Sequence, residues 1–247
     1  MCRLASIVER ETWKLKVRQR AAVALLHLSG SQPPDSMRLQ HTLARSLALA
    51  LPRRLAEPQI VHNVLEPCEC KALIDECRIH GQWRSLHRKY ATVDMPIELL
   101  PSGPRLLAKM RECLLPQFAT LFGKRYGPTE SLEFRHGSGL PGLFVVRYSC
   151  LENTREDGVP PQRGLAGHVD ESLVSFVLTL SSTADFTGGG TRFERASPAV
   201  VRPPCGSAVL FLGRVWHEGV PITTGERFVL VGLVNRVNNG KWRDTDS

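Results

Sequence analysis

Apolar and polar residues alternate over short runs along most of the chain, and Gly or Pro residues separate these runs. Short alternating runs bounded by turn residues are typical of β-strands. Many short strands punctuated in this way favour a mainly β protein with flanking helices, built as a double-stranded β-helix, or jelly roll. The predicted strands are residues 59–65, 132–135, 143–148, 172–180, 191–194, 199–202, 207–212 and 228–234.

Helical periodicity predicts two helices that flank these strands. Residues 67–80 have Pro at the first turn and Gly81 just beyond the last, which is the usual asymmetry of helix ends. Residues 104–122 repeat apolar side chains every three or four positions. Helices of this kind are expected to buttress one sheet of the jelly roll.

A basic segment precedes the predicted strands. Residues 1–58 contain ten Lys and Arg against four Asp and Glu, which accounts for +6 of the net charge of +8. Apolar residues recur at helical spacing from Trp13 to Leu28 and from Leu39 to Leu51, so a pair of helices is predicted. We therefore expect a basic helical N-terminal extension, residues 1–57, and a β domain, residues 58–247. The extension could be a hairpin packed on that domain, a docking element for a nucleic acid or acidic partner, or an organelle transit segment.

Composition narrows the class of protein. We expect no membrane span and no secretory signal, because no apolar run is long enough for either role. Seven cysteines without framework spacing indicate reduced thiols, so a cytoplasmic location is expected, with organelle targeting through the basic extension as the alternative. Cys68 and Cys70 resemble half of a zinc site, but no second pair of ligands follows at the required spacing.

Three residues form a candidate metal site. His168 and Asp170 stand two positions apart, and residues two apart on a strand face the same side, so both could bind one ion. His217 would be the third ligand. Two imidazoles and one carboxylate form the facial set that leaves open positions on non-haem Fe(II). Each residue alone is ordinarily structural, so the prediction depends on the set.

Arg227 follows His217 by ten residues and begins another apolar run. Its planar guanidinium is suited to binding a buried carboxylate with two hydrogen bonds. If the strand of Arg227 runs beside the strand of His217, this side chain would lie deeper in the pocket than the metal. A dicarboxylate bound to the metal at one end could then be held by Arg227 at the other.

These motifs together resemble the Fe(II)/2-oxoglutarate-dependent dioxygenases, and within them the catalytic domain of procollagen lysyl hydroxylases, with prolyl 4-hydroxylases next. The resemblance implies that His168, Asp170 and His217 bind iron. It also implies that Arg227 binds the distal carboxylate of 2-oxoglutarate. The resemblance covers roughly residues 58–236, and the matching segments are 143–148, 168–170, 186–193, 213–214 and 217–227.

The same resemblance implies further pocket residues and a reaction. Tyr148 would donate a hydrogen bond to 2-oxoglutarate, and Thr179 would line the pocket. The implied enzyme uses Fe(II), 2-oxoglutarate and dioxygen, with L-ascorbate (vitamin C) as a further cofactor, to hydroxylate an unactivated C–H bond. A Lys or Pro side chain of a protein or peptide is the expected substrate.

Two other functions stay open at this point. One is an oxygenase of the same family that acts on a nucleic acid or a small molecule. The nucleic-acid branch typically carries a second Arg six residues after the first, where this chain has Leu233, so a nucleic-acid partner is not favoured. The other is a non-catalytic binding module with a vestigial site. Residues 150–165 form a longer loop than is usual in the family, and this loop could be a lid or a surface insertion.

Overall fold

The computed structural model divides the chain into two compact units, Met1–Leu51 and Pro52–Ser247. In the first unit, residues 42–46 and 48–49 are helical, within the second predicted helix. The first predicted helix lies outside the described residues, and the predicted boundary between residues 57 and 58 stays a prediction. The described residues are 42–46, 48–49, 51, 56–85, 92–121, 132–134, 142–151, 162–196, 198–238 and 241–242.

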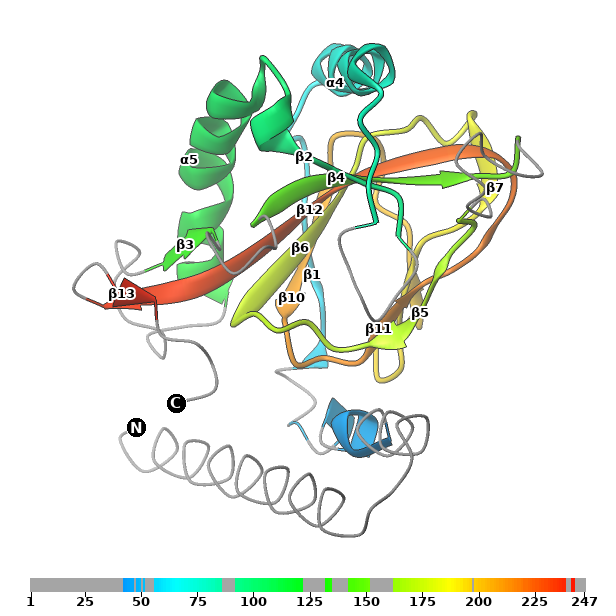
Figure 1. Ribbon diagram of the computed structural model, residues 1–247. Coiled ribbons are helices and arrows are strands. Elements are labelled where there is room, and N and C mark those ends of the chain that lie inside the picture. The colour runs from blue at the N-terminus through cyan, green and yellow to red at the C-terminus, as the bar shows by residue number, and fades with distance from the viewer. Residues whose placement is uncertain are drawn as a thin grey trace, which may run out of the picture. The chain divides into compact units, whose positions relative to one another are not determined.

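The second unit contains a large antiparallel sheet in the order β1-β10-β6-β12-β4-β2, and β3, β7 and β13 also pair with β12 (Figure 1). The long strand β12 pairs with β4 on one side and β6 on the other, so it forms the middle of the sheet. The strands are β1 (Gln59–Val61), β2 (Asp94–Pro96), β3 (Leu132–Phe134), β4 (Leu143–Ser149), β6 (Val174–Thr179), β7 (Phe186–Gly188), β10 (Ala208–Leu212), β12 (Ile222–Asn238) and β13 (Lys241–Trp242).

A smaller sheet faces the large one. It consists of β5 (Leu165–His168), β8 (Thr191–Phe193), β9 (Val200–Val201) and β11 (His217–Gly219), in the order β5-β11-β8-β9. The rings of Phe211 on β10 and His217 on β11 have centroids 4.5 Å apart, so the facing sides of the two sheets are in contact. Two facing antiparallel sheets are the architecture of a jelly roll. The predicted fold class is confirmed.

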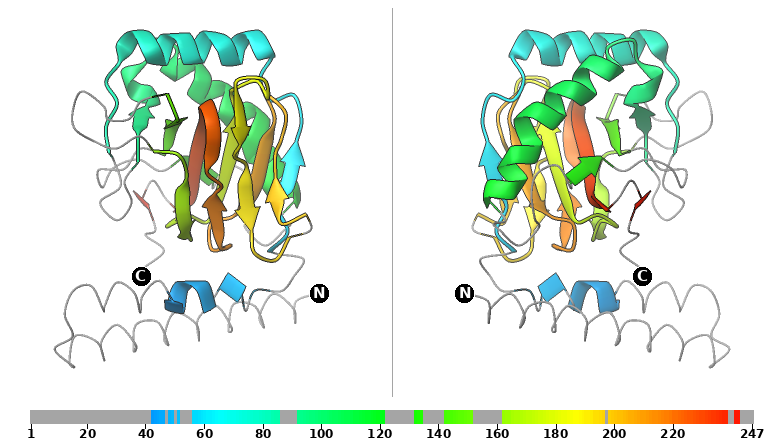
Figure 2. Two further views of the ribbon diagram at one scale, coloured as in Figure 1. Left: turned by 90° about the vertical axis from the view of Figure 1, so that its right-hand side faces the viewer. Right: turned by 90° about the vertical axis from the view of Figure 1, so that its left-hand side faces the viewer.

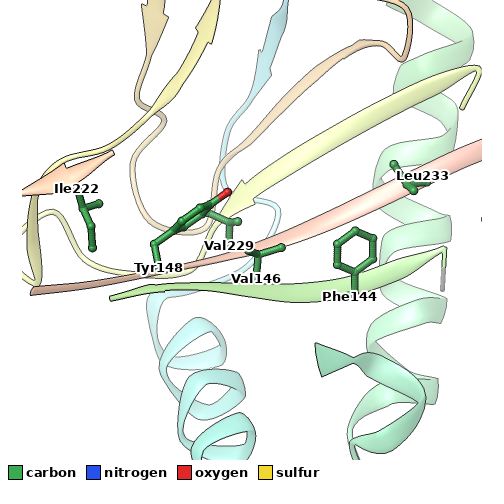
Figure 3. Packing of buried hydrophobic residues seen from close by; sticks show 6 residues of the cluster. All are labelled: Phe144, Val146, Tyr148, Ile222, Val229 and Leu233. Atoms are coloured by element: carbon green, nitrogen blue, oxygen red, sulfur yellow. The ribbon is translucent and has the colours of Figure 1, made fainter. Parts of the chain in front are cut away.

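An apolar cluster fills the space between the sheets, and we call it the inner-face cluster. Alternate residues of β4 and β12 supply most of it, because every second side chain of a strand points to the same face. Leu165 of β5 packs against it from the smaller sheet. The cluster consists of Phe144, Val146, Tyr148, Ile222, Val229 and Leu233 (Figure 3).

Helices α4 (Pro67–His80) and α5 (Gly103–Leu121) accompany the large sheet, and a short 3-10 turn, η1 (Ile97–Leu99), precedes α5. The predicted bounds of α4 are confirmed. Glu66 and Glu69 form a capping box at its start, and Gly81 adopts the left-handed conformation at its end. Helix α5 begins and ends one residue earlier than predicted and lies across one face of the large sheet (Figure 2).

Several predicted strands are shorter in the structure. The run 59–65 forms a strand only as far as Val61, because the N–H groups of Val64 and Leu65 donate to the carbonyl of Gly206 instead of joining the sheet. The run 172–180 begins at Val174, and the run 199–202 keeps two residues. Most of the predicted loop 150–165 lies outside the described residues. Among the helices that the structure describes, none combines the length and the hydrophobicity that crossing a bilayer requires.

Glu226 links α4 to the large sheet. Its carboxylate accepts a hydrogen bond from Arg147 of β4, at 2.7 Å, and another from Arg78 of α4, at 2.9 Å. The Glu226 side chain is 10% exposed. The guanidinium of Arg78 also lies over the Phe228 ring, 5.2 Å from its centroid. One half-buried ionic contact therefore holds the helix against the outer face of β12.

We expect Glu226→Gln to lower the free energy of unfolding by about 1.5–3 kcal/mol, because a neutral amide cannot serve both guanidinium groups. Urea denaturation measures this change. Lys71→Ala is the matched control, since it removes an exposed ion pair with Asp75 on α4 and should cost under about 0.5 kcal/mol. Equal losses in the two variants would show that Glu226 contributes no more than a surface charge.

Candidate metal centre

Three predicted ligand residues meet between the two sheets. His168 is the last residue of β5, His217 is the first residue of β11, and the two are direct partners across this antiparallel pair. Residues directly opposite one another project to the same face, so both imidazoles enter the same space. One ligand atom each from His168, Asp170 and His217 lies within 4.8 Å of the others. Among the described residues, this is the group of His, Cys, Asp or Glu side chains that could hold a metal ion.

The structure corrects the way in which Asp170 reaches the site. The prediction assigned His168 and Asp170 to one strand, but β5 ends at His168 and Asp170 lies in the turn before β6. The N–H of Asp170 donates to the carbonyl of Gly213, at 2.8 Å, in the loop that leads to β11. A hydrogen bond between two turns, rather than the two-residue period of a strand, therefore orients Asp170.

Backbone carbonyl groups fix the protonation of both imidazoles. The Nδ1 atom of His168 lies 2.8 Å from the carbonyl oxygen of Ala166, and the Nδ1 atom of His217 lies 3.0 Å from that of Val215. Because a carbonyl oxygen can only accept, each Nδ1 must carry the proton. The Nε2 atoms face Asp170 at 3.4 Å and 3.8 Å. Their lone pairs are therefore available to a metal ion, as in metal-binding histidines generally.

The electrostatics of the site favour these ligand forms for Asp170 and His217. For His168, burial acts to lower the pKa, but the hydrogen bond with Asp170 and the charge of Asp170 outweigh it and raise the pKa. Burial acts to raise the pKa of Asp170, but the neighbouring His217 and His168 and a hydrogen bond from Ser175 outweigh it and hold the pKa below its ordinary value. Burial, together with the charge of His168, lowers the pKa of His217 to about 4. An ionised carboxylate and a neutral imidazole are the forms that bind a metal ion.

Arg227 lies in the other sheet, so the condition under which it was expected to lie deeper than the metal, a strand beside that of His217, is not met. Its strand, β12, does not pair with β11 but with β4 and β6 of the large sheet. Arg227 and Tyr148 are direct partners across β12 and β4, and the guanidinium carbon lies 5.3 Å from the centroid of the Tyr148 ring. Thr179 on β6 is the partner of Val229, two residues after Arg227. The three predicted pocket residues Arg227, Tyr148 and Thr179 are all buried, at 3 to 5% exposed.

Two glycines make room for Tyr148 and Arg227. A Cβ atom on Gly219, two residues after His217, would lie 2.9 Å from the Tyr148 hydroxyl, so that hydroxyl lies against β11. A Cβ atom on Gly189 would lie 3.1 Å from Cδ of Arg227. Gly189 has a φ of 63° between β7 and β8, a backbone conformation that glycine adopts without strain. Figure 3 shows the Tyr148 ring beside Ile222 in the inner-face cluster.

The sequence analysis assigned no role in the site to Gly219 or to Gly189. Gly219 follows His217 by only two residues, which places it near the site. Its role becomes clear only from the position of Tyr148, which belongs to the other sheet. The two glycines bring the polar ends of Tyr148 and Arg227 toward the strands that carry the histidines. The arrangement can therefore accommodate a metal ion beside a buried site for an anionic group.

The relatives found by sequence comparison are named as procollagen lysine hydroxylases. No family model matches the chain. It is 28% identical over 179 residues to a multifunctional procollagen lysine hydroxylase and glycosyltransferase of Rattus norvegicus, and 29% identical over 180 residues to that of Caenorhabditis elegans. It is 26% identical over 179 residues to the procollagen-lysine,2-oxoglutarate 5-dioxygenase 1 of Mus musculus. Each match covers 67% of this chain but only 22% of the relative, so the chain spans about a fifth of their length.

Solved structures share the fold. A prolyl-4-hydroxylase of Pseudomonas putida superposes with a TM-score of 0.51 at 21% identity, over 75% of this chain and 99% of the other. A non-haem α-ketoglutarate-dependent carbocyclase from nogalamycin biosynthesis gives a TM-score of 0.50 at 10% identity, over 76% of this chain and 85% of the other. Fold and site thus define a jelly-roll protein with a His-Asp-His group that could hold a metal ion. In sequence, the chain is similar to proteins named as procollagen lysine hydroxylases and 2-oxoglutarate 5-dioxygenases.

We expect the protein to bind one divalent ion per chain, and His168→Ala or Asp170→Ala to remove this binding, because two remaining ligands cannot form the facial set. Isothermal titration with Mn(II) measures the stoichiometry. Cys68→Ser, an exposed cysteine outside the group, is the control and should bind like the wild type. Undiminished binding in both ligand variants would contradict the assignment.

Proposed function

We propose that this chain is an Fe(II)- and 2-oxoglutarate-dependent dioxygenase that hydroxylates an unactivated C–H bond on a Lys or Pro side chain of a protein. The observation that carries this proposal is the buried group of His168, Asp170 and His217, with the guanidinium of Arg227 held in the facing sheet. When bound, Fe(II) and 2-oxoglutarate supply the oxidising chemistry with dioxygen. The protein's own residues bind and orient these reactants and exclude water.

The three ligands suit Fe(II). Two neutral imidazoles and one carboxylate leave positions open for other molecules, which a closed structural site would not do. The hydrogen bonds from His168 and His217 to backbone carbonyls keep both rings in a fixed orientation. Asp170 supplies one negative charge, so a divalent ion would retain a net positive charge and attract the carboxylate end of a 2-oxo acid.

The surroundings of Arg227 suit the far carboxylate of 2-oxoglutarate. Burial lowers the pKa of Arg227, because the interior disfavours its charge. Within the described part of the chain, Arg227 forms no ion pair with a carboxylate, and its ring neighbour is Tyr148. A buried cation of this kind is costly unless an anion compensates it. A ligand carboxylate held by Arg227 and the Tyr148 hydroxyl would supply that compensation.

The choice of a protein substrate rests on the names of the relatives, which are lysine hydroxylases of procollagen. Because the chain spans about a fifth of those proteins, we propose a Lys or Pro side chain of a protein as the substrate class and not procollagen in particular. A nucleic-acid substrate is less favoured, since Leu233 packs in the inner-face cluster at the position where that branch carries a second Arg. L-ascorbate as a cofactor and a cytoplasmic location belong to the same proposal.

The direct test is incubation of the purified protein with Fe(II), 2-oxoglutarate and a library of peptides that contain Lys or Pro. We expect some peptides to gain one oxygen atom on these side chains, with matching release of succinate, as measured by mass spectrometry. His217→Ala, which removes one proposed ligand, is the matched control and should give neither product. Succinate release stimulated only by nucleosides or other small molecules would contradict the proposed substrate class.

The second test concerns the cosubstrate. Arg227→Ala should raise the 2-oxoglutarate concentration needed for half-maximal succinate release by at least about 100-fold. This follows because breaking a buried ion pair costs about 3–5 kcal/mol and about 1.4 kcal/mol corresponds to a factor of ten. Arg227→Lys should fall between, since it keeps the charge but loses the planar fork. Mn(II) affinity should be unchanged.

Arg192→Ala is the matched control, because Arg192 is an exposed arginine that pairs with Glu218 on the surface. It should leave the 2-oxoglutarate requirement unchanged. An Arg227→Ala curve that overlays the wild-type curve would mean that another residue holds the cosubstrate.

A further inference from the structure

A buried acidic residue, Asp94, lies on the inner face of the large sheet. It is 0% exposed and belongs to β2, which lies beside β4 at the edge of that sheet (Figure 1). Asp94 pairs directly with Val146, a member of the inner-face cluster. Residues directly opposite one another on antiparallel strands project to the same face, so the Asp94 side chain points between the two sheets. Figure 3 shows Val146 and Tyr148 on the same side of β4, so Asp94 shares its face with Tyr148.

Strand pairing places Asp94 in line with the predicted pocket. One row of direct partners crosses the inner face, and Tyr148 and Arg227 form the next row. Diagonal neighbours on adjacent strands lie about 7–8 Å apart, which is within reach of an aromatic side chain, and Asp94 and Tyr148 are such neighbours. The first row consists of Asp94, Val146, Val229 and Thr179.

Hydrogen bonds fix the position of Asp94. Its backbone N–H donates to the carbonyl of Arg84, and its carbonyl accepts from the N–H of Arg84, both at 2.8 Å. The hydroxyl of Thr92 donates to one oxygen of the carboxylate. Because β4 pairs with the other side of β2, the backbone of Asp94 is held from both sides. The carboxylate is therefore preorganised on this face.

The side chain of Gln162 connects β2 to the smaller sheet. Its Oε1 atom accepts from the N–H of Val93, at 2.7 Å, and its Nε2 atom donates to the carbonyl of Gly164, at 3.3 Å. A Cβ atom on Gly164 would lie 2.7 Å from the carbonyl oxygen of Gly219, so this segment is in close contact with β11. The strand that carries Asp94 is thus tied to the strand that carries a proposed metal ligand.

The charge of Asp94 also acts on the pocket. Burial raises the pKa of Tyr148, the charge of Arg227 opposes this rise, and the charge of Asp94 adds to it. Two other described acidic residues have largely buried side chains, but Glu226 faces α4 and Asp170 belongs to the metal group. Among the described residues, Asp94 is therefore the acidic residue available for a further role on the inner face.

We propose that Asp94 is a specificity-determining residue that binds the ammonium group of a substrate lysine, so that this site takes Lys rather than Pro side chains. This inference rests on the proposed function and deepens it. A carboxylate on an apolar face is stabilised by a cation that reaches it, and an ammonium group supplies both charge and donors. The apolar Val146 beside Asp94 suits the hydrocarbon stem of lysine. A proline side chain has neither a charge nor a donor, so it would gain nothing from Asp94.

The test compares two peptides that carry either lysine or norleucine at the modified position. Norleucine keeps the hydrocarbon stem but lacks the ammonium group. The peptide sequence is that of the lysyl peptide hydroxylated best in the library described above. Succinate release gives KM and kcat, and calorimetry on the Mn(II)-loaded protein with 2-oxoglutarate gives Kd. The wild type should bind the lysine peptide about 10–100-fold more tightly than the norleucine peptide, because a hydrogen bond between charged groups contributes roughly this factor.

Asp94→Asn, which keeps the shape but loses the charge, should raise KM and Kd for the lysine peptide about 10–100-fold. It should also remove the preference for lysine over norleucine. A purely structural role would weaken both peptides alike, so the ratio between them separates the two cases. Asp94→Glu keeps the charge and should retain the preference.

Asp75→Asn is the matched control, because Asp75 is a carboxylate on α4 that pairs with Lys71 at the surface. It should leave the preference for lysine unchanged. Thermal unfolding shows whether each variant folds, and if Asp94→Asn does not fold, the smaller neutral replacement Asp94→Ser takes its place. The comparison of the two peptides on the wild type needs no variant at all.

A wild type that hydroxylates prolyl but not lysyl peptides would overturn this inference and leave the proposed function standing. So would equal affinity of the wild type for the lysine and norleucine peptides, or an undiminished preference for lysine in a folded neutral variant. A wild type that hydroxylates neither lysyl nor prolyl peptides would contradict the proposed function, and this inference with it.

Discussion

Asp170 holds a negative charge between two sheets whose facing side chains are mostly apolar. Such a charge is tolerated only where other groups pair with it and donate hydrogen bonds to it. His168 and His217 supply this environment from the smaller sheet, and Ser175 of the large sheet also acts to lower the pKa of Asp170. The partners come from different strands, so the carboxylate is accommodated only when the two sheets close on the same space. Closure of the jelly roll and assembly of the site are therefore one event.

The position of Arg227 also depends on packing between layers, through strand β12. Alternate residues of β12 point to opposite faces of the large sheet. Arg227 and Val229 face the smaller sheet, whereas Glu226 and Phe228 face the side of α4. The ionic contact of Glu226 with Arg78 fixes the outer side of the strand against the helix. Because a strand cannot shift one face without the other, the helix layer also determines where the Arg227 guanidinium lies.

Much of the secondary structure could be predicted from local sequence patterns. The bounds of helix α4 follow from a Pro at its start and Gly81 at its end, and both signals act within a few residues. The strands were recognised because alternation is also local, although their ends were less well predicted. At Val64, for example, the backbone leaves the sheet because a distant carbonyl, that of Gly206, accepts its hydrogen bond. The grouping of the ligand residues was likewise anticipated from residue types and spacing.

Features that depend on contacts between distant segments could not be predicted in this way. Sequence spacing could not assign Arg227 to the large sheet, because strand pairing joins residues far apart in the chain. Nor could it show that the bare Cα of Gly219 admits the Tyr148 hydroxyl. A ligand set recognised from spacing thus identifies which atoms can bind a metal. What lies beyond that metal is determined by small residues such as Gly219, whose role appears only when the sheets face each other.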